Sequence, residues 1–352
     1  MPEHPVVSLG EGNTALIRSE VLARQYGFSN LYFKLESTNP TGSYKDRFAA
    51  AAVAHLRKSH AGLCLATSSG NTGAALAAYS AKVGMPCHIA VVDGAPQGKL
   101  KQMQAYGARL WMVKGFGQDG DTTRGVFEKL TEMATAHSTS VQISAFRYSP
   151  VGMEGVQTIA YEIAEELPAV RHIFVPAGGG GLALAMARGC SIWHAAQNNG
   201  FLPAIHCVQS YGNDTIAGNL RKGREKARPI PFSKTKISGL QVPSVIDGDE
   251  VIQACRKLGG NGHLVEDAEV FECQRLLASK EGIYCEPAGA VALSGAIKAL
   301  NSKEIVPDQP VVCLITGHGF KDLWSTDQLI KSNPVTCVQN ITQINVPFDG
   351  YE

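Results

Sequence analysis

Short apolar runs alternate along the chain with longer stretches in which apolar residues recur at helical spacing. In the first half, nearly continuous apolar runs suit strands of a parallel sheet covered on both faces, and they lie at residues 63–67, 87–92 and 108–113. Each run precedes a stretch of helical periodicity, so we expect helices at residues 71–83, 98–106 and 122–137.

The same alternation resumes after Pro150. It predicts further strands at residues 172–176, 205–209 and 311–315. The helices predicted in this half are residues 153–166, 182–196, 250–258, 270–281 and 288–300. A polar, proline-containing loop of residues 221–245 interrupts the pattern, and loops of that length are often functional.

The pattern therefore indicates the α/β class, in the form of two doubly wound domains with parallel sheets. We expect a small domain of residues 51–150 and a large domain that combines residues 1–50 with 151–352. A ligand cleft between two such domains is the default expectation. Residues after Ser332 form a predicted tail or arm.

Composition narrows the classes of function. Hydrophobic residues make up 44% of the chain and charged residues 18%, as in ordinary globular proteins. The formal net charge of +1 gives no reason to expect nucleic acid or an acidic membrane surface as a partner. No apolar run reaches transmembrane length, and the N-terminus lacks the features of a signal peptide, so we expect a cytoplasmic protein.

The nine cysteines are scattered, and no two of them have a CxxC spacing. Most have apolar neighbours, which predicts reduced, buried thiols instead of disulfides or a zinc site. The histidines have no spacing that suggests metal either, so no metal site is expected.

Lys45 is the first candidate for chemistry. It follows the turn-forming residues Pro40 and Gly42 and opens an alanine-rich predicted helix of residues 48–56. A turn that leads into a helix can hold one amine at a fixed point in a pocket. An amine held in this way can lose its proton and attack a carbonyl group.

Four consecutive glycines lie between the predicted strand 172–176 and the next helix: Gly178, Gly179, Gly180 and Gly181. Glycines let backbone N–H groups approach an anion, and the helix N-terminus adds a favourable partial charge. The run therefore favours a phosphate cradle over a merely flexible turn. It matches neither the dinucleotide-binding GxGxxG pattern nor a P-loop.

A second strand-to-helix junction, residues 68–73, offers hydroxyls, an amide and free N–H groups at a helix start. It suits a carboxylate or a ring hydroxyl, although Ser and Asn also cap helices routinely, and the cap is the better interpretation of this segment alone. A third junction places Thr316 after the predicted strand 311–315, where ligands of α/β proteins bind. His318 is either catalytic or part of a turn between two glycines.

Four segments resemble those of pyridoxal-phosphate (PLP) enzymes of fold type II, the tryptophan synthase β-chain type, and within it the threonine synthases. The segments are SLGEGNT at 8–14, NPTGSYKDR at 39–47, EPAGA at 286–290 and TGHGFKD at 316–322. Tyr44 stands where phenylalanine is more usual. The resemblance runs from about residue 6 to 325 in the expected order, and it implies PLP in the cleft between the two domains.

The resemblance also implies roles for individual residues. Lys45 binds the cofactor as a Schiff base and shuttles protons, and Asn71 bonds the ring hydroxyl. Gly178 to Gly181 hold the cofactor phosphate, and Thr316 faces the pyridine nitrogen. Candidates for the substrate carboxylate are Ser69, Gly70 and Thr72. The large domain then binds the cofactor, and the small, mobile domain faces the substrate. A homodimer is also implied.

One position departs from the family pattern. Threonine synthases usually carry an arginine that helps hold the substrate phosphate, and Gly152 stands at that place. Arg147, five residues earlier, is a candidate replacement from a shifted loop. The resemblance implies a lyase acting on an amino acid with a side-chain leaving group, and threonine synthase is the leading hypothesis. A serine or threonine dehydratase or ammonia-lyase, a replacement enzyme such as a cysteine or cysteate synthase, and a PLP-binding regulatory homologue stay open.

Overall fold

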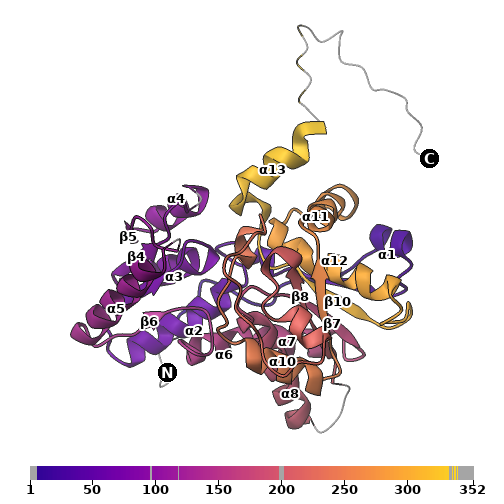
Figure 1. Ribbon diagram of the computed structural model, residues 1–352, viewed down its shortest axis with the longest axis horizontal. Helices are drawn as coiled ribbons and strands as arrows, with labels where there is room; N and C mark the ends of the chain where they lie inside the picture. The colour runs from indigo at the N-terminus through magenta and orange to yellow at the C-terminus, as the bar shows by residue number, and fades with distance from the viewer. Residues whose placement is uncertain are drawn as a thin grey trace.

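The computed structural model describes residues 6–332 other than 96, 118 and 198–201, together with residues 335, 337 and 339. Two sheets organise the chain, and helices cover both of them (Figure 1). We call them the small sheet and the large sheet. The predicted tail beyond Ser332 lies almost entirely outside the described residues.

The small sheet has four parallel strands in the order β5-β4-β3-β6. These strands are β3 (Cys64–Thr67), β4 (Cys87–Val91), β5 (Arg109–Met112) and β6 (Val141–Gln142). Its helices are α2 (Lys45–Lys58), α3 (Asn71–Lys82), α4 (Gln97–Ala105) and α5 (Gly120–Ala136). The three predicted strand-and-helix pairs of this half are thus present.

The large sheet has six strands in the order β1-β2-β10-β7-β8-β9. Its strands are β1 (Leu16–Arg18), β2 (Leu31–Lys34), β7 (His172–Pro176), β8 (Ala204–Ser210), β9 (Gly262–Val265) and β10 (Val311–Leu314). All pairings are parallel except that of β1 with β2. The fold is therefore α/β with parallel-dominated sheets, as predicted, and the antiparallel edge strand β1 is an addition that the prediction did not include.

The helices associated with the large sheet include several that the sequence did not predict. They are α1 (Val21–Tyr26), α6 (Pro150–Val156), α7 (Thr158–Glu166), α8 (Gly181–Gln197), α9 (Ala217–Arg221), α10 (Gly248–Lys257), α11 (Asp267–Glu281), α12 (Pro287–Asn301) and α13 (Leu323–Leu329). The predicted helix 153–166 is two helices in the structure. The first, α6, begins at Pro150 and ends at Val156, and the second, α7, begins at Thr158. Proline at a first helical position fixes a suitable φ and lacks only an N–H that would have no partner there.

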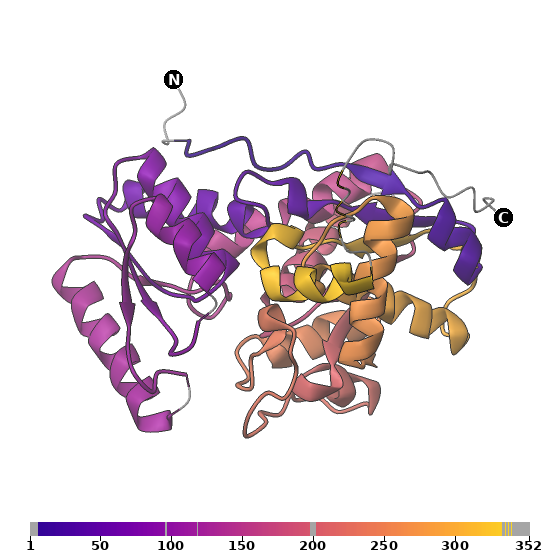
Figure 2. The same ribbon diagram turned by 90° about the horizontal axis from the view of Figure 1, so that it is seen from above.

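All strands of the small sheet come from residues 64–142, whereas the large sheet draws on the chain before and after that range. The segment 6–15 also runs from the small-sheet side to β1 (Figure 2). Helix α2 continues through residue 50, so the predicted border there falls inside a helix. The domain bounds themselves stay a prediction.

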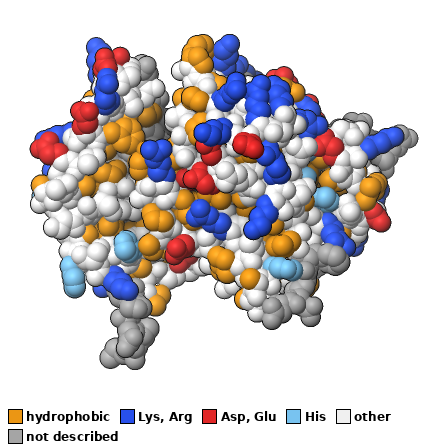
Figure 3. Space-filling model, turned by 60° about the horizontal axis from the view of Figure 1, so that its bottom comes forward, with side chains coloured by type: hydrophobic (Ala, Val, Ile, Leu, Met, Phe, Trp, Pro, Cys, Tyr) orange, Lys and Arg blue, Asp and Glu red, His pale blue; other side chains and the backbone are white. Residues whose placement is uncertain are grey.

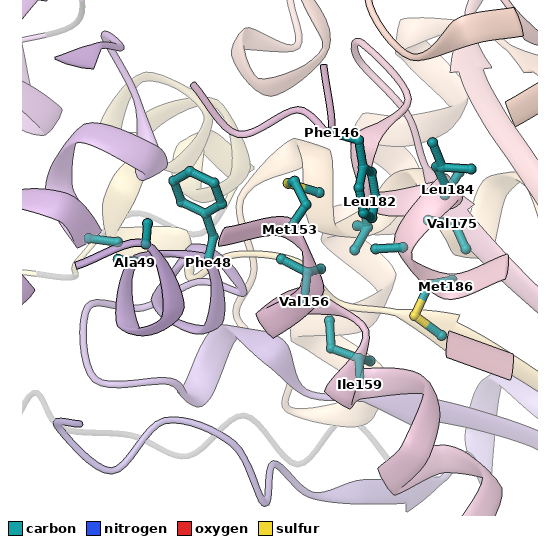
Figure 4. Packing of buried hydrophobic residues seen from close by; sticks show 14 of the residues in the cluster. Phe48, Ala49, Phe146, Met153, Val156, Ile159, Val175, Leu182, Leu184 and Met186 are labelled. Atoms are coloured by element: carbon teal, nitrogen blue, oxygen red, sulfur yellow. The ribbon is translucent and has the colours of Figure 1, made fainter. Parts of the chain in front are cut away.

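The core is continuous between the two sheets. Phe48 of α2 lies beside Met153 of α6, and both side chains are buried (Figure 4). This contact fixes the first turn of α2, and with it Lys45, against the large-sheet side.

The thiols and the surface agree with the composition. Eight cysteines are free and buried, and Cys337 is free and exposed. Basic and acidic side chains are both present on the face shown in Figure 3, as a net charge near zero leads one to expect. In the part of the chain that the structure describes, no helix is long and apolar enough to cross a membrane.

Candidate active site

A cavity of about 390 Å³ opens where strands of both sheets end. Thr67 is the last residue of β3, Pro176 is the last residue of β7, and Thr316 follows β10. All three line the cavity. The carboxyl ends of parallel strands are where α/β proteins bind ligands. The three strand-to-helix junctions singled out in the sequence therefore meet in one place.

Lys45 is the first residue of α2 and reaches into this cavity. Gly42 supplies a φ of 86° in the turn before it, a conformation that glycine adopts without strain. Burial lowers the pKa of the Lys45 amine to about 7, although the charges of Glu286 and Asp247 act in the opposite direction. A substantial fraction of this amine is therefore neutral, and so nucleophilic, near neutral pH.

A short chain of hydroxyls contacts the amine. Lys45 Nζ donates a hydrogen bond of 2.6 Å to Ser144 Oγ, and Ser144 Oγ lies 3.0 Å from Thr72 Oγ1. Ser144 follows β6 and Thr72 lies in the first turn of α3, so both come from the small-sheet side. The chain connects the amine with the helix start predicted to bind a carboxylate.

Asn71 presents its amide between the two sides of the cavity. Its Nδ2 donates to Glu286 Oε1 at 2.6 Å, while its Oδ1 is buried without a hydrogen-bond partner among the described residues. Glu286 precedes α12 and is itself buried. A buried polar atom without a partner is costly, and such an atom on a cavity wall is available to a ligand.

The glycine run lines the opposite wall and enters α8, a helix of 17 residues. Gly180 has a φ of 96°, and a Cβ there would lie 2.8 Å from Val251 Cγ2. A Cβ on Gly178 would lie 3.1 Å from the carbonyl oxygen of Gly239. Side chains are thus excluded at these positions, and backbone N–H groups at a helix N-terminus remain open to an anion.

At the start of α3 the serines have structural partners as well. Ser68 Oγ accepts hydrogen bonds from the N–H groups of Gly70 and Gly73, at 3.3 and 3.0 Å, which is the cap-like role expected of such a residue. Ser69 Oγ accepts from Val92 N at 2.7 Å. Both serines, Gly70 and Thr72 also line the cavity, so the capping interpretation and the binding interpretation are compatible here.

Thr316 and His318 differ in position. Thr316 is 4% exposed and lines the cavity, and its carbonyl accepts from Tyr44 N, beside the reactive lysine. His318 is not on the cavity wall; its Nδ1 accepts from Phe320 N, and its ring stacks on that of Phe320. The geometry favours the turn-forming interpretation of His318.

Arg147 and Gly152 lie away from the cavity lining. The Arg147 side chain is exposed, and its backbone N–H donates to Asp247. Gly152 is buried, and a Cβ there would lie 2.6 Å from a ring carbon of Phe48, which occupies the space beside α6 (Figure 4). The structure therefore does not bring these two positions together with the predicted substrate residues.

The comparison with known proteins adds the family. A family model of pyridoxal-phosphate-dependent enzymes matches residues 7–317, which is most of the chain. The chain belongs to the pyridoxal-phosphate-dependent enzymes. Curated relatives of this family include the threonine synthase of Methanocaldococcus jannaschii, which is 34% identical over 91% of this chain and 78% of its own length. The threonine synthase of Halalkalibacterium halodurans is 32% identical over 94% of this chain and 89% of its own.

Solved structures of PLP enzymes share the fold. The chain superposes on maize serine racemase with a TM-score of 0.76 at 22% identity, covering 91% of this chain and 92% of that one. For a threonine deaminase from Solanum lycopersicum the TM-score is 0.74 at 22% identity, with coverages of 90% and 82%. These similarities show the fold type alone.

The cavity has the groups that this family's cofactor requires. Lys45 supplies an amine for its aldehyde, and the Gly178–Gly181 loop supplies the close backbone approach that a phosphate needs. Asn71, whose Oδ1 has no partner among the described residues, and the buried Thr316 would contact a ring held between them. The donor set fits PLP, which is the cofactor of this family.

The lining residues that were not predicted as site residues include Ser144, Glu286 and Lys99. Glu286 belongs to the EPAGA segment, so a signal was present but gave no role. Ser144 and Lys99 carry no local pattern. Each reaches the site only because β6 and α4 lie beside β3 and α3 in the folded chain.

Proposed function

We propose that this protein is a PLP-dependent carbon–oxygen lyase acting on an amino acid that carries a side-chain leaving group. The reaction that we propose first is that of threonine synthase, which converts O-phospho-L-homoserine and water to L-threonine and phosphate. The observation that carries the proposal is Lys45, a cavity amine whose pKa is lowered by burial to about 7. The similarity to threonine synthases supports the same reaction.

The cofactor supplies an aldehyde for the substrate amine and a conjugated ring that accepts electrons from the substrate's Cα. Lys45 would remove and return protons at the substrate carbons. Ser144 Oγ, 2.6 Å from Lys45 Nζ, orients the amine and contacts Thr72 in turn. Asn71 and Thr316 would hold the ring, and Gly178 to Gly181 the phosphate.

On the substrate side, we propose that Ser69, Gly70 and Thr72 bind the α-carboxylate. They lie at the N-terminus of α3, a helix of 12 residues, where N–H groups and the helix dipole favour a negative charge. Arg147 would contact the substrate only after its loop moves toward the cavity, because its side chain now lies outside the lining.

A second candidate is elimination from serine or threonine by a dehydratase. No arginine is among the described residues that line the cavity, and Gly152 leaves no room for one on α6. A neutral hydroxyl leaving group would require no guanidinium.

An assay panel separates these candidates. The PLP-loaded enzyme is given O-phospho-L-homoserine, L-serine, L-threonine and O-acetyl-L-serine, with phosphate, keto acid and amino acid products measured. Threonine with stoichiometric phosphate supports the first candidate, and keto acid from serine or threonine supports the second. The absence of phosphate release from O-phospho-L-homoserine would eliminate the threonine synthase reaction.

The cytoplasmic location and the homodimer belong to the same proposal. Gel filtration with light scattering tests the dimer, and a monomer at micromolar concentration would reject it. A regulatory homologue without activity would bind PLP and show visible absorbance, but would turn over none of the four substrates.

A further inference from the structure

Lys99 is a buried cation on the cavity wall. It lies in α4 on the small-sheet side and is 4% exposed. Its Nζ donates to Ser238 Oγ at 3.1 Å and to Glu286 Oε2 at 3.2 Å, and both acceptors belong to the large-sheet side. The Lys99 side chain therefore links the small-sheet side of the cavity wall to the large-sheet side.

These contacts are long for a buried ammonium. Charge-assisted hydrogen bonds are usually about 2.7–2.9 Å. Lys34 illustrates the difference, because its Nζ has acceptors at 2.5 Å, 2.7 Å and 2.9 Å. Lys99 Nζ has two, and no third acceptor among the described residues. One of its three N–H groups is thus open to a ligand.

Several cationic side chains share the carboxylate of Glu286. Among the described residues that line the cavity, Glu286 is the single carboxylate, and its Oε1 already accepts a hydrogen bond from Asn71. Lys45 and Lys321 also interact with it electrostatically. Burial lowers the pKa of Lys321 to about 8, and the positive charge of Lys99 acts in the same direction, whereas the charges of Glu286 and Asp46 act against it. An anion at Lys99 would give this lysine a partner that it does not share with Lys45 and Lys321.

We propose that Lys99, together with Ser238, binds an anionic side-chain group of the substrate and so selects substrates whose leaving group is a phosphate ester. The inference rests on the proposed function. It gives Lys99 the part that the family pattern assigns to the position of Gly152, where Phe48 fills the space. A substrate anion would accept a hydrogen bond from the open N–H of Lys99. It would also compete with Glu286 for the N–H group that Glu286 now accepts.

The test compares substrates that differ in the charge of the leaving group. Steady-state kinetics of the PLP-loaded full chain are measured with O-phospho-L-homoserine, O-phospho-L-serine and their O-acetyl counterparts. Lys99→Gln is expected to lower kcat/KM for the phosphorylated substrates by about 10–100-fold, mainly through KM, since one charged hydrogen bond is lost. The loss with the acetyl substrates should be much smaller.

Two further variants on the chain serve as matched controls. Lys99→Arg retains the charge and should recover most of the phosphate preference. Lys101→Gln removes an exposed lysine two residues along the same helix and should behave as wild type.

Binding is measured independently of turnover, by calorimetry with the phosphonate analogue of O-phospho-L-homoserine. Lys99→Gln should weaken binding about 10–100-fold. Glu286→Gln removes the competing carboxylate and should tighten it several-fold. Opposite changes in the two variants support an anion site, whereas similar losses in both would show that the pair is only structural and would overturn the inference.

The remaining outcomes are also decisive. If Arg147→Gln alone removes the phosphate preference, the anion binds at Arg147 and the inference is wrong. Equal losses of Lys99→Gln on phosphorylated and acetyl substrates would reject it as well. If no substrate is turned over but the phosphonate still binds through Lys99, the inference stands and the proposed function fails.

Discussion

Lys45 and Arg47 lie two residues apart at the start of α2, yet their side chains enter buried polar clusters of opposite character. The cluster around Arg47 consists of Arg47, Glu36, Glu162, Lys34 and Thr14, and we call it the framework cluster. The cluster around Lys45 consists of Lys45, Asn71, Lys99, Ser144 and Glu286, and we call it the cavity cluster.

The framework cluster is closed. Arg47 makes hydrogen bonds of 2.7 and 2.8 Å to the two oxygens of Glu36, and of 2.6 and 2.8 Å to those of Glu162. Burial disfavours the charge on Glu162, but hydrogen bonds from Arg47 and Lys34 outweigh it and lower the Glu162 pKa to about 2. Buried charges with all their partners are rigid and leave nothing for a ligand.

The cavity cluster is open. Asn71 Oδ1 has no partner among the described residues, Lys99 is held by long contacts, and the pKa of Lys45 is lowered by burial. One short motif, residues 39–47, thus supplies both a reactive group and the support that holds it. Incomplete pairing, more than burial or charge, therefore distinguishes the cavity cluster from the framework cluster.

The largest expected effect tests the cavity side of the comparison. Lys45→Ala should lower turnover by at least about 10²–10⁴-fold, because it removes the group that transfers protons. The visible absorbance of the PLP-loaded protein should also be lost, while the free energy of unfolding of the cofactor-free protein should not fall. Lys58→Ala, which alters an exposed lysine on the same helix, is the control for both measurements. Full activity of Lys45→Ala would refute the assignment.

For the framework cluster we expect a loss of stability on substitution. Arg47→Met should lower the free energy of unfolding by about 3–5 kcal/mol in urea titrations, because it leaves buried carboxylates without their partner. Arg275→Met breaks an exposed pair with Glu272 and should cost about 0–1 kcal/mol. If the two variants lost the same stability, the framework cluster would not be a structural support.

The sequence was sufficient for the parts of this comparison that depend on local pattern. Apolar runs predicted β3, β4, β7 and β10, and the glycines at 178–181 lie on the cavity wall as expected for a strand-to-helix junction. Lys45 was identifiable from its motif. The family resemblance from these segments is confirmed by the family match.

The remainder depends on long-range packing. Strands β1 and β2 are short and lie in a segment whose apolar pattern is weak, so the antiparallel edge was missed. Ser144 is 99 residues from the lysine that it contacts, and Lys99 is 187 residues from Glu286. No spacing in the sequence reports such contacts. The assignment of Arg147 to the substrate stays a prediction, and its exposed position could not be inferred from sequence.

Gly152 lies in α6 at its contact with α2, the helix that carries both Lys45 and Arg47. Its missing Cβ lets α6 approach Phe48, so Gly152→Ala should lower the free energy of unfolding by about 1–3 kcal/mol through overpacking. Gly125→Ala in α5 has free space around it and should instead stabilise by about 0.4–1 kcal/mol. Thermal unfolding of both variants provides the comparison. Equal stabilisation by the two changes would mean that the α2–α6 contact is looser than the structure shows.

The smallest effect concerns the proton on Lys45. Its pKa in the folded chain is lowered by burial from 10.5 to about 7, so the unfolded chain binds this proton between those values and the folded chain does not. Lys45 therefore makes the cofactor-free protein more stable as pH rises from about 7 to 10.5. The initial rate of PLP binding, followed by visible absorbance, should fall about tenfold per pH unit below 7 and level off above it, since only the neutral amine reacts. Pyridoxal, which lacks the titrating phosphate, should give the same midpoint. A rate that still rises through pH 9 would indicate an ordinary, solvated lysine, and the contrast between the open and the closed cluster would then have to rest on Asn71 and Lys99 alone.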